Sequence, residues 1–150
     1  MRPKITWIAV ADGNRATVYL NNGPNRGLEI IPGRGGYQEV PPSREILSDS
    51  AGRMKGGAGA RGAAPMNASA DPHELEEARF AEQFAEEINR AALEQQFDRL
   101  ILAAPPRTLG ILRKSLSEKA GRRLIAEIDK DLTKISRDDL AARIADHLPV

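Results

Sequence analysis

The chain has 150 residues, of which 41% are hydrophobic and 29% are charged, and its net charge is +1. These values are typical of one globular domain with a single core. The absence of cysteine excludes disulfides and thiolate chemistry and is compatible with a reducing cytoplasm. The N-terminal apolar run ends at Asp12 and is too short for a signal peptide. No run approaches the roughly 18 apolar residues that span a membrane. We therefore expect a cytoplasmic protein with one domain, residues 1–150, and no membrane partner.

The N-terminal third predicts an antiparallel meander. Residues 5–11 are almost all apolar, which is typical of a central strand covered on both faces. A turn signal at 12–14 and a β-branched, aromatic segment at 16–20 predict a hairpin. A short third strand is expected at 28–31. Residues 32–48 are rich in glycine and proline, so we expect them to be irregular.

A well-marked helix begins after this region. Asp71 is a good N-cap, Pro72 suits the first helical position, and Glu74 completes a capping box. The helix is expected to run to about Gln95. Apolar residues recur along it at helical spacing and predict one buried stripe. They are Leu75, Phe80, Phe84, Ile88 and Ala91 or Ala92.

Alternating elements complete the chain. We expect a buried strand at 99–104, a helix at 108–119, a strand at 123–128 and a last helix at 136–147. The order β-β-β-α-β-α-β-α predicts a single α/β domain. Its mixed sheet is antiparallel in the N-terminal meander and parallel where helices join strands, with helices on both faces.

The same order is found in ribonuclease-H-like nucleases, whose carboxylates hold two metal ions. Asp12 and either Glu74 or Glu77 could supply two of the carboxylates. The third is missing, because the strand at 99–104 ends in Ala-Pro-Pro. We therefore interpret Asp12 as a turn residue and expect no metal ion.

Residues 49–70 form a basic, glycine-rich segment. Its glycines lose much backbone freedom on ordering and bury no side chain, so they favour a flexible loop. Exposed backbone N–H groups and cations suit a phosphate. The residues that would bind it are Arg53, Lys55, Gly56, Gly57 and Arg61. Residues 57–62 match the dinucleotide-binding pattern, but no strand precedes them, so no cofactor is expected.

Charge is segregated between two neighbouring helical regions. Residues 71–95 hold eight acids and two arginines, whereas residues 107–123 hold six cations and one acid. The pattern indicates either ion pairs between elements or a basic surface for a polyanion. On the second interpretation Arg107, Arg113 and Lys114 would bind phosphate.

Acid–base chemistry is a further alternative. His73 and Glu77 lie one helical turn apart, but two such residues do not make a zinc site. His73 lies near the positive end of the helix dipole, which favours capping or a local hydrogen bond. If the chain were a hydrolase closing over a phosphorylated ligand, Asp12, His73 and Glu74 would be its acid and base candidates.

Several short motifs, in this order and spacing, resemble the bacterial host attachment protein family. They are Trp-Ile-Ala-Val-Ala-Asp-Gly at 7–13, Asp-Pro-His-Glu at 71–74, Phe-Asp-Arg-Leu-Ile-Leu-Ala-Ala-Pro-Pro at 97–106 and Glu-Ile-Asp-Lys-Asp-Leu-Thr at 127–133. The resemblance covers nearly the whole chain. It implies a role in attachment to a host, although the sequence has no signal, repeat or disulfide typical of an adhesin.

That family is similar to the middle domain of archaeal and eukaryotic peptide-chain release factors and of ribosome-rescue proteins. In the release factors a long loop carries Gly-Gly-Gln, which promotes release of the nascent chain at the ribosome. Here Gly56 and Gly57 are followed by Ala58. The resemblance therefore implies a docking loop without the catalytic glutamine, and a ribosome or RNA as partner. We expect a non-catalytic RNA- or ribosome-associated factor. The alternatives are a small hydrolase of phosphorylated or peptidyl-tRNA substrates and an adhesion module.

Overall fold

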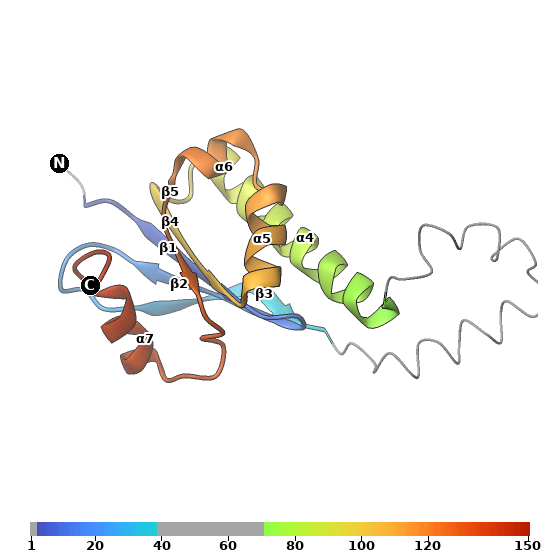
Figure 1. The fold of residues 1–150 in the computed structure, drawn as a ribbon. Coiled ribbons are helices and arrows are strands. Elements are labelled where there is room, and N and C mark those ends of the chain that lie inside the picture. Colours follow the sequence, from blue (N-terminus) through green and yellow to red (C-terminus); the bar gives the residue numbers. More distant parts are fainter. Residues whose placement is uncertain (1–2, 39–70) are drawn as a thin grey trace, which may run out of the picture.

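The computed structural model describes residues 3–38 and 71–150 (Figure 1). The predicted order of elements is confirmed, with one helix more than expected. The elements are β1 (Thr6–Ala11), β2 (Arg15–Asn21), β3 (Glu29–Tyr37), α4 (Pro72–Leu93), β4 (Arg99–Ala104), α5 (Pro106–Ser115), α6 (Glu118–Arg122), β5 (Leu124–Asp129) and α7 (Arg137–Ile144). The basic segment at 49–70 lies outside the described residues.

The five strands form one mixed sheet in the order β3-β2-β1-β4-β5. β1 pairs antiparallel with β2, and β2 pairs antiparallel with β3, which confirms the meander. β4 pairs parallel with β1 on one side and with β5 on the other. All six residues of β1 are buried, as expected for a central strand.

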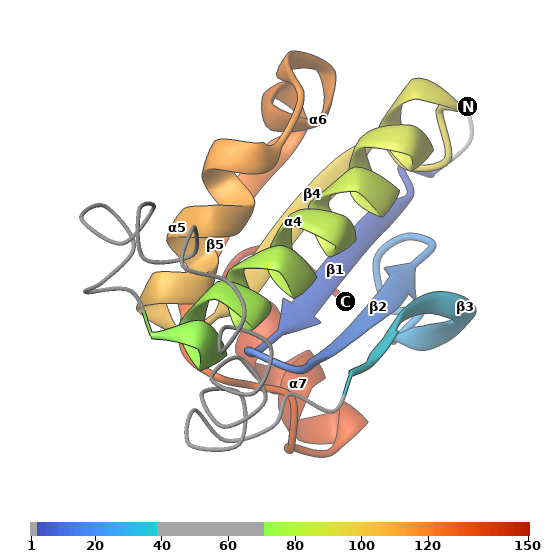
Figure 2. The same cartoon turned by 90° about the vertical axis from the view of Figure 1, so that its right-hand side faces the viewer.

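Helices cover both faces of the sheet (Figures 1 and 2). α4, α5 and α6 lie on one face, and α7 lies on the other. Alternate residues of β1 supply the two cores: Trp7 and Ala9 pack beneath α4, whereas Ile8 and Val10 pack toward α7. Among the described residues, no helix combines the length and the apolar character needed to cross a bilayer.

The prediction for β3 was too short. The strand runs to Tyr37 through a segment that we expected to be irregular. The pairing with β2 shifts register between Thr17 and Tyr19, and Gly33 and Gly35 adopt positive φ angles of 79° and 76°. The glycines thus allow the irregular backbone that keeps the strand paired, and the backbone N–H of Gly35 donates to Glu87 on α4.

The prediction of one helix at 108–119 was also wrong. Leu116 has an extended ψ of 139° and ends α5, and the Ser117 hydroxyl accepts from the backbone N–H of Ala120 to cap α6. Asn89 of α4 holds this break, because its side chain bonds the backbone of both Ser115 and Ser117.

The first turns of α4 are less buried than the apolar stripe predicted. Leu75 is 47% exposed, and the first buried residue of the helix is Phe80. The rest of the stripe is confirmed, since Phe84 and Ile88 are buried. The N-cap is confirmed as well: the Asp71 side chain accepts from the backbone N–H of His73.

Candidate functional site

Four strands end at one edge of the sheet, which we call the carboxyl edge. β1, β4 and β5 are parallel, and β3 ends beside them because Tyr37 pairs with Arg15. Both borders of residues 39–70 lie near this edge: the backbone N–H of Gln38 donates to the Asn14 carbonyl at 2.7 Å, and Glu77, near the start of α4, packs against Gly13 of the same turn. Ligands of open α/β sheets bind outside the carboxyl ends of strands, so this edge is the candidate site.

Asp12 follows β1 and holds the turn into β2. One carboxylate oxygen accepts from the backbone N–H groups of Asn14 and Arg15, both at 2.9 Å. The other carboxylate oxygen is 3.1 Å from the hydroxyl of Thr133, a residue that follows β5. The interpretation of Asp12 as a turn residue is confirmed. Thr133 ends the motif at 127–133, but nothing in the sequence pattern indicated its contact with Asp12, because the two residues are 121 positions apart.

His73 and Glu77 lie on the first turns of α4. Their imidazole Nε2 and carboxylate Oε2 are 3.2 Å apart, and each side chain is about one-third exposed. The Glu77 carboxylate packs against Gly13, where a Cβ would lie 2.2 Å from Oε2. Gly13 therefore allows the turn after β1 to touch α4. His73 makes a local contact of the kind that the sequence favoured.

Arg107 lies on the first turn of α5 and is paired with Glu74. The guanidinium is 2.9 Å from the Glu74 carboxylate, and the two side chains are 50% and 49% exposed. A phosphate-binding candidate and an acid–base candidate thus neutralise each other across α4 and α5. Together with Asp12 and His73, they are brought to the carboxyl edge.

Arg113 and Lys114 lie in the last turn of α5, away from this edge. The Arg113 guanidinium bonds both carboxylate oxygens of Glu127, with Nε at 2.9 and 3.1 Å and Nη2 at 2.5 Å. The hydrogen bond and the charge of Glu127 raise the pKa of Arg113. Arg122 similarly pairs with Glu118. Ion pairs therefore account for three of the segregated cations, and Lys114 is exposed.

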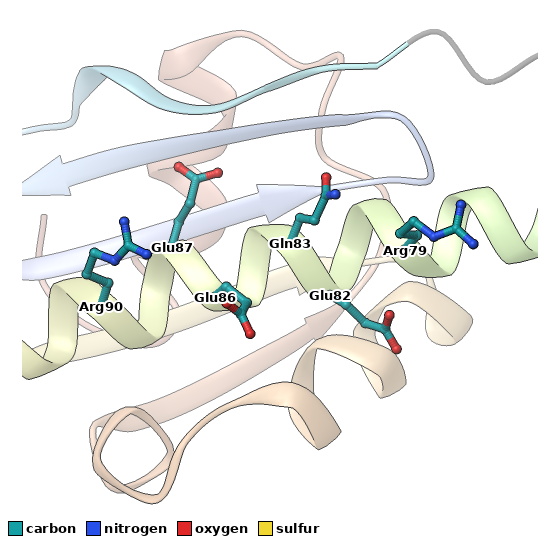
Figure 3. Close-up of a pocket in the computed structure, with 6 residues that line it drawn as sticks. All are labelled: Arg79, Glu82, Gln83, Glu86, Glu87 and Arg90. Carbon is teal, nitrogen blue, oxygen red and sulfur yellow. The ribbon is translucent and has the colours of Figure 1, made fainter.

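The outer face of α4 carries a shallow hollow, shown in Figure 3. Two arginines flank three glutamates and a glutamine along it, so its net charge is −1 and does not favour an anion. The lining side chains are Arg79, Glu82, Gln83, Glu86, Glu87 and Arg90. Within residues 3–38 and 71–150, no three carboxylate or imidazole side chains are grouped to hold a metal ion.

These features define an open, mixed α/β domain with a polar carboxyl edge. The sequence matches the family described as "Protein required for attachment to host cells" over residues 7–144, and the chain belongs to that family. No curated protein matches the sequence.

Two solved structures are similar in fold. One is an archaeal translation termination factor, with 12% identity and a TM-score of 0.46 over 95% of this chain and 38% of that one. The other is described as an archaeal protein, with 10% identity and a TM-score of 0.50 over 97% of this chain and 35% of that one. The chain thus spans less than two-fifths of either structure.

Proposed function

We propose that this protein is a non-catalytic RNA- or ribosome-associated factor. The observation that carries the proposal is the position of residues 38 and 71, which border residues 39–70 and so enclose the basic segment in the chain, at the carboxyl edge. Gln38 bonds the turn after β1, and Glu77 of α4 packs against the same turn. Arg53, Lys55 and Arg61 lie between these two residues in the chain, and the edge itself carries Arg107.

The ion pair of Arg107 is compatible with phosphate binding. Both partners are about half exposed, and exposed pairs contribute only about 0–1 kcal/mol to stability. A phosphate can therefore replace the Glu74 carboxylate at small cost, and it offers Arg107 bidentate, charge-assisted hydrogen bonds. Arg113 is less available, because Glu127 holds it through two of its nitrogens.

Two features favour binding over hydrolysis. Ala58 follows Gly56 and Gly57, where the release factors that the chain resembles carry glutamine. The carboxylate of Asp12 is engaged at both oxygens, by the backbone of its own turn and by Thr133. A group occupied in this way is poorly placed to take a proton from water.

Co-sedimentation with ribosomes tests the proposal. The full chain should sediment with ribosomes at low salt and dissociate steeply as salt rises, because phosphate contacts release counterions. Replacing Arg53, Lys55 and Arg61 with alanine should weaken binding and reduce the salt slope by about two to three.

A matched variant controls for net charge. Lys4, Arg26 and Arg143 are exposed, and the first two lie near the opposite edge of the sheet. Replacing these three with alanine removes the same charge and should leave binding close to wild type. Failure of the wild-type chain to bind ribosomes or RNA at low salt would overturn the proposal, as would equal effects of the two triple variants.

A further inference from the structure

We infer that Tyr37 is a stacking platform for an unpaired base of single-stranded RNA. The inference rests on the proposed function and adds to it a residue and a ligand chemistry. Tyr37 is the last residue of β3 and is 62% exposed. The guanidinium carbon of Arg15 lies 5.4 Å from the centroid of its ring. One side of the ring thus faces a cation, and the residue still exposes a large surface to a ligand.

The platform is held in place by backbone contacts on both sides. Tyr37 pairs with Arg15 across β2 and β3, and the next backbone N–H, that of Gln38, donates to Asn14. The backbone N–H of Arg15 in turn donates to Asp12. Because the backbone that carries the ring is already ordered, only the side-chain torsions of Tyr37 have to be fixed when a base stacks on it, which lowers the entropy cost of binding.

The strand beside the ring leaves room for a nucleotide. A Cβ built on Gly36 or on Gly33 would have nothing within 4 Å. These positions carry no side chain of their own, so a ribose and its phosphate can approach the backbone closely. Within residues 3–38 and 71–150, the other exposed large hydrophobic residues are aliphatic and offer no flat face for a base: Ile30, Leu75, Leu93 and Ile125.

The chemistry of the surroundings favours RNA over a protein partner. Proteins that bind single strands combine aromatic platforms with cations that follow the phosphates. Tyr37 lies at the carboxyl edge, which also carries Arg107. The Arg15 guanidinium lies over one face of the Tyr37 ring and attracts its π electrons. The stacking of an electron-rich base on the ring is therefore strengthened by the same electrostatic attraction that holds the cation there.

Binding of a fluorescently labelled, unstructured 12-nucleotide RNA to the full chain, followed by anisotropy, tests the inference. Tyr37→Ala should weaken binding about 5- to 160-fold, which corresponds to the roughly 1–3 kcal/mol found when one base loses its aromatic partner. Tyr37→Phe should bind like wild type, because it keeps the ring, and Tyr37→Leu should fail like alanine. Ile30→Ala is the matched control, since Ile30 is 54% exposed on the same strand and should have no effect.

The salt dependence separates this inference from the proposed function. Tyr37→Ala should lower affinity at every salt concentration without changing the slope, because no phosphate contact is lost. The Arg53, Lys55 and Arg61 variant should change the slope. If Tyr37→Ala binds RNA as wild type does, the stacking site is wrong and the proposed function stands. If the wild-type chain binds no RNA or ribosome at low salt, both are wrong.

Discussion

Gly35 and Gly13 each lie close to another part of the chain, but a side chain added at the two positions would meet different kinds of group. At Gly35 the backbone has a φ of +76°, and a Cβ would lie 2.3 Å from the backbone oxygen of Ala16. At Gly13 the Cβ would meet the end of the Glu77 side chain, which can rotate away. The first clash is with a strand of the sheet, whereas the second is with a flexible group.

We therefore expect Gly35→Ala to lower the free energy of unfolding by roughly 2–3 kcal/mol, since strained backbone alone costs about 1–3 kcal/mol. Gly13→Ala should cost less than about 1 kcal/mol. Urea unfolding of both variants measures the difference. Gly33→Ala separates strain from clash, because Gly33 has a φ of +79° with nothing within 4 Å of a built Cβ. Equal losses for Gly33→Ala and Gly35→Ala would contradict the clash with Ala16.

The residues of the candidate site were only partly predictable. Asp12, His73 and Glu74 each stand at a local signal, a turn or a helix start, and the sheet topology then brings them to one edge. The contacts that connect this edge are not local. Thr133 reaches Asp12 across 121 residues, and Arg107 reaches Glu74 across 33. Sequence spacing carries no information about such pairs, which depend on how the strands and helices pack in the folded domain.

At the scale of elements, Asn89 connects α4 to the break between α5 and α6. Its side-chain nitrogen donates to the Ser115 carbonyl at 2.9 Å, and its oxygen accepts from the Ser117 N–H at 2.8 Å. Asn89→Ala leaves both backbone groups without this partner, and we expect the free energy of unfolding to fall by about 1–3 kcal/mol.

Asn89→Asp keeps the acceptor for the Ser117 N–H but turns a carboxylate oxygen toward the Ser115 carbonyl, so its loss of stability should be at least as large as that of alanine. Gln83→Ala is the control on the same helix, because Gln83 is exposed on the outer face (Figure 3), and it should change stability by less than about 0.5 kcal/mol. Thermal or urea unfolding gives all three values. A loss for Gln83→Ala as large as that for Asn89→Ala would show that the bridge is not responsible.

Elements with strong periodic signals were predicted well, and those shaped by tertiary contacts were not. α4 shows its start in Asp71 and Pro72 and its buried face in Phe84 and Ile88. The break after Leu116 depends on Asn89 from another helix, and the cap at Ser117 that starts α6 was not predicted. The end of β3 is similar: its glycines look like a loop, and only β2 beside them makes a strand.

At the scale of the whole molecule, β1 and β4 serve two cores at once. Ile8 and Ile101 pack toward α7 on one face, while Trp7 and Leu102 pack beneath α4 on the other. If the packing on one face of these strands is lost, the hydrogen bonds between the strands change as well. The packing on the other face depends on those same hydrogen bonds. We therefore expect both layers to unfold together, as small single domains usually do.

Leu140→Ala tests this coupling, because Leu140 of α7 is 1% exposed in the core opposite the single tryptophan, Trp7. Loss of its buried side chain should cost about 2–5 kcal/mol. If the sheet transmits the loss, the unfolding midpoints from tryptophan fluorescence and from far-ultraviolet circular dichroism should fall by the same amount. Ala142→Ser, at an exposed position of α7, should leave both nearly unchanged. A fall in the dichroism midpoint alone would mean that α7 unfolds separately, because Trp7 would then still report an intact layer beneath α4.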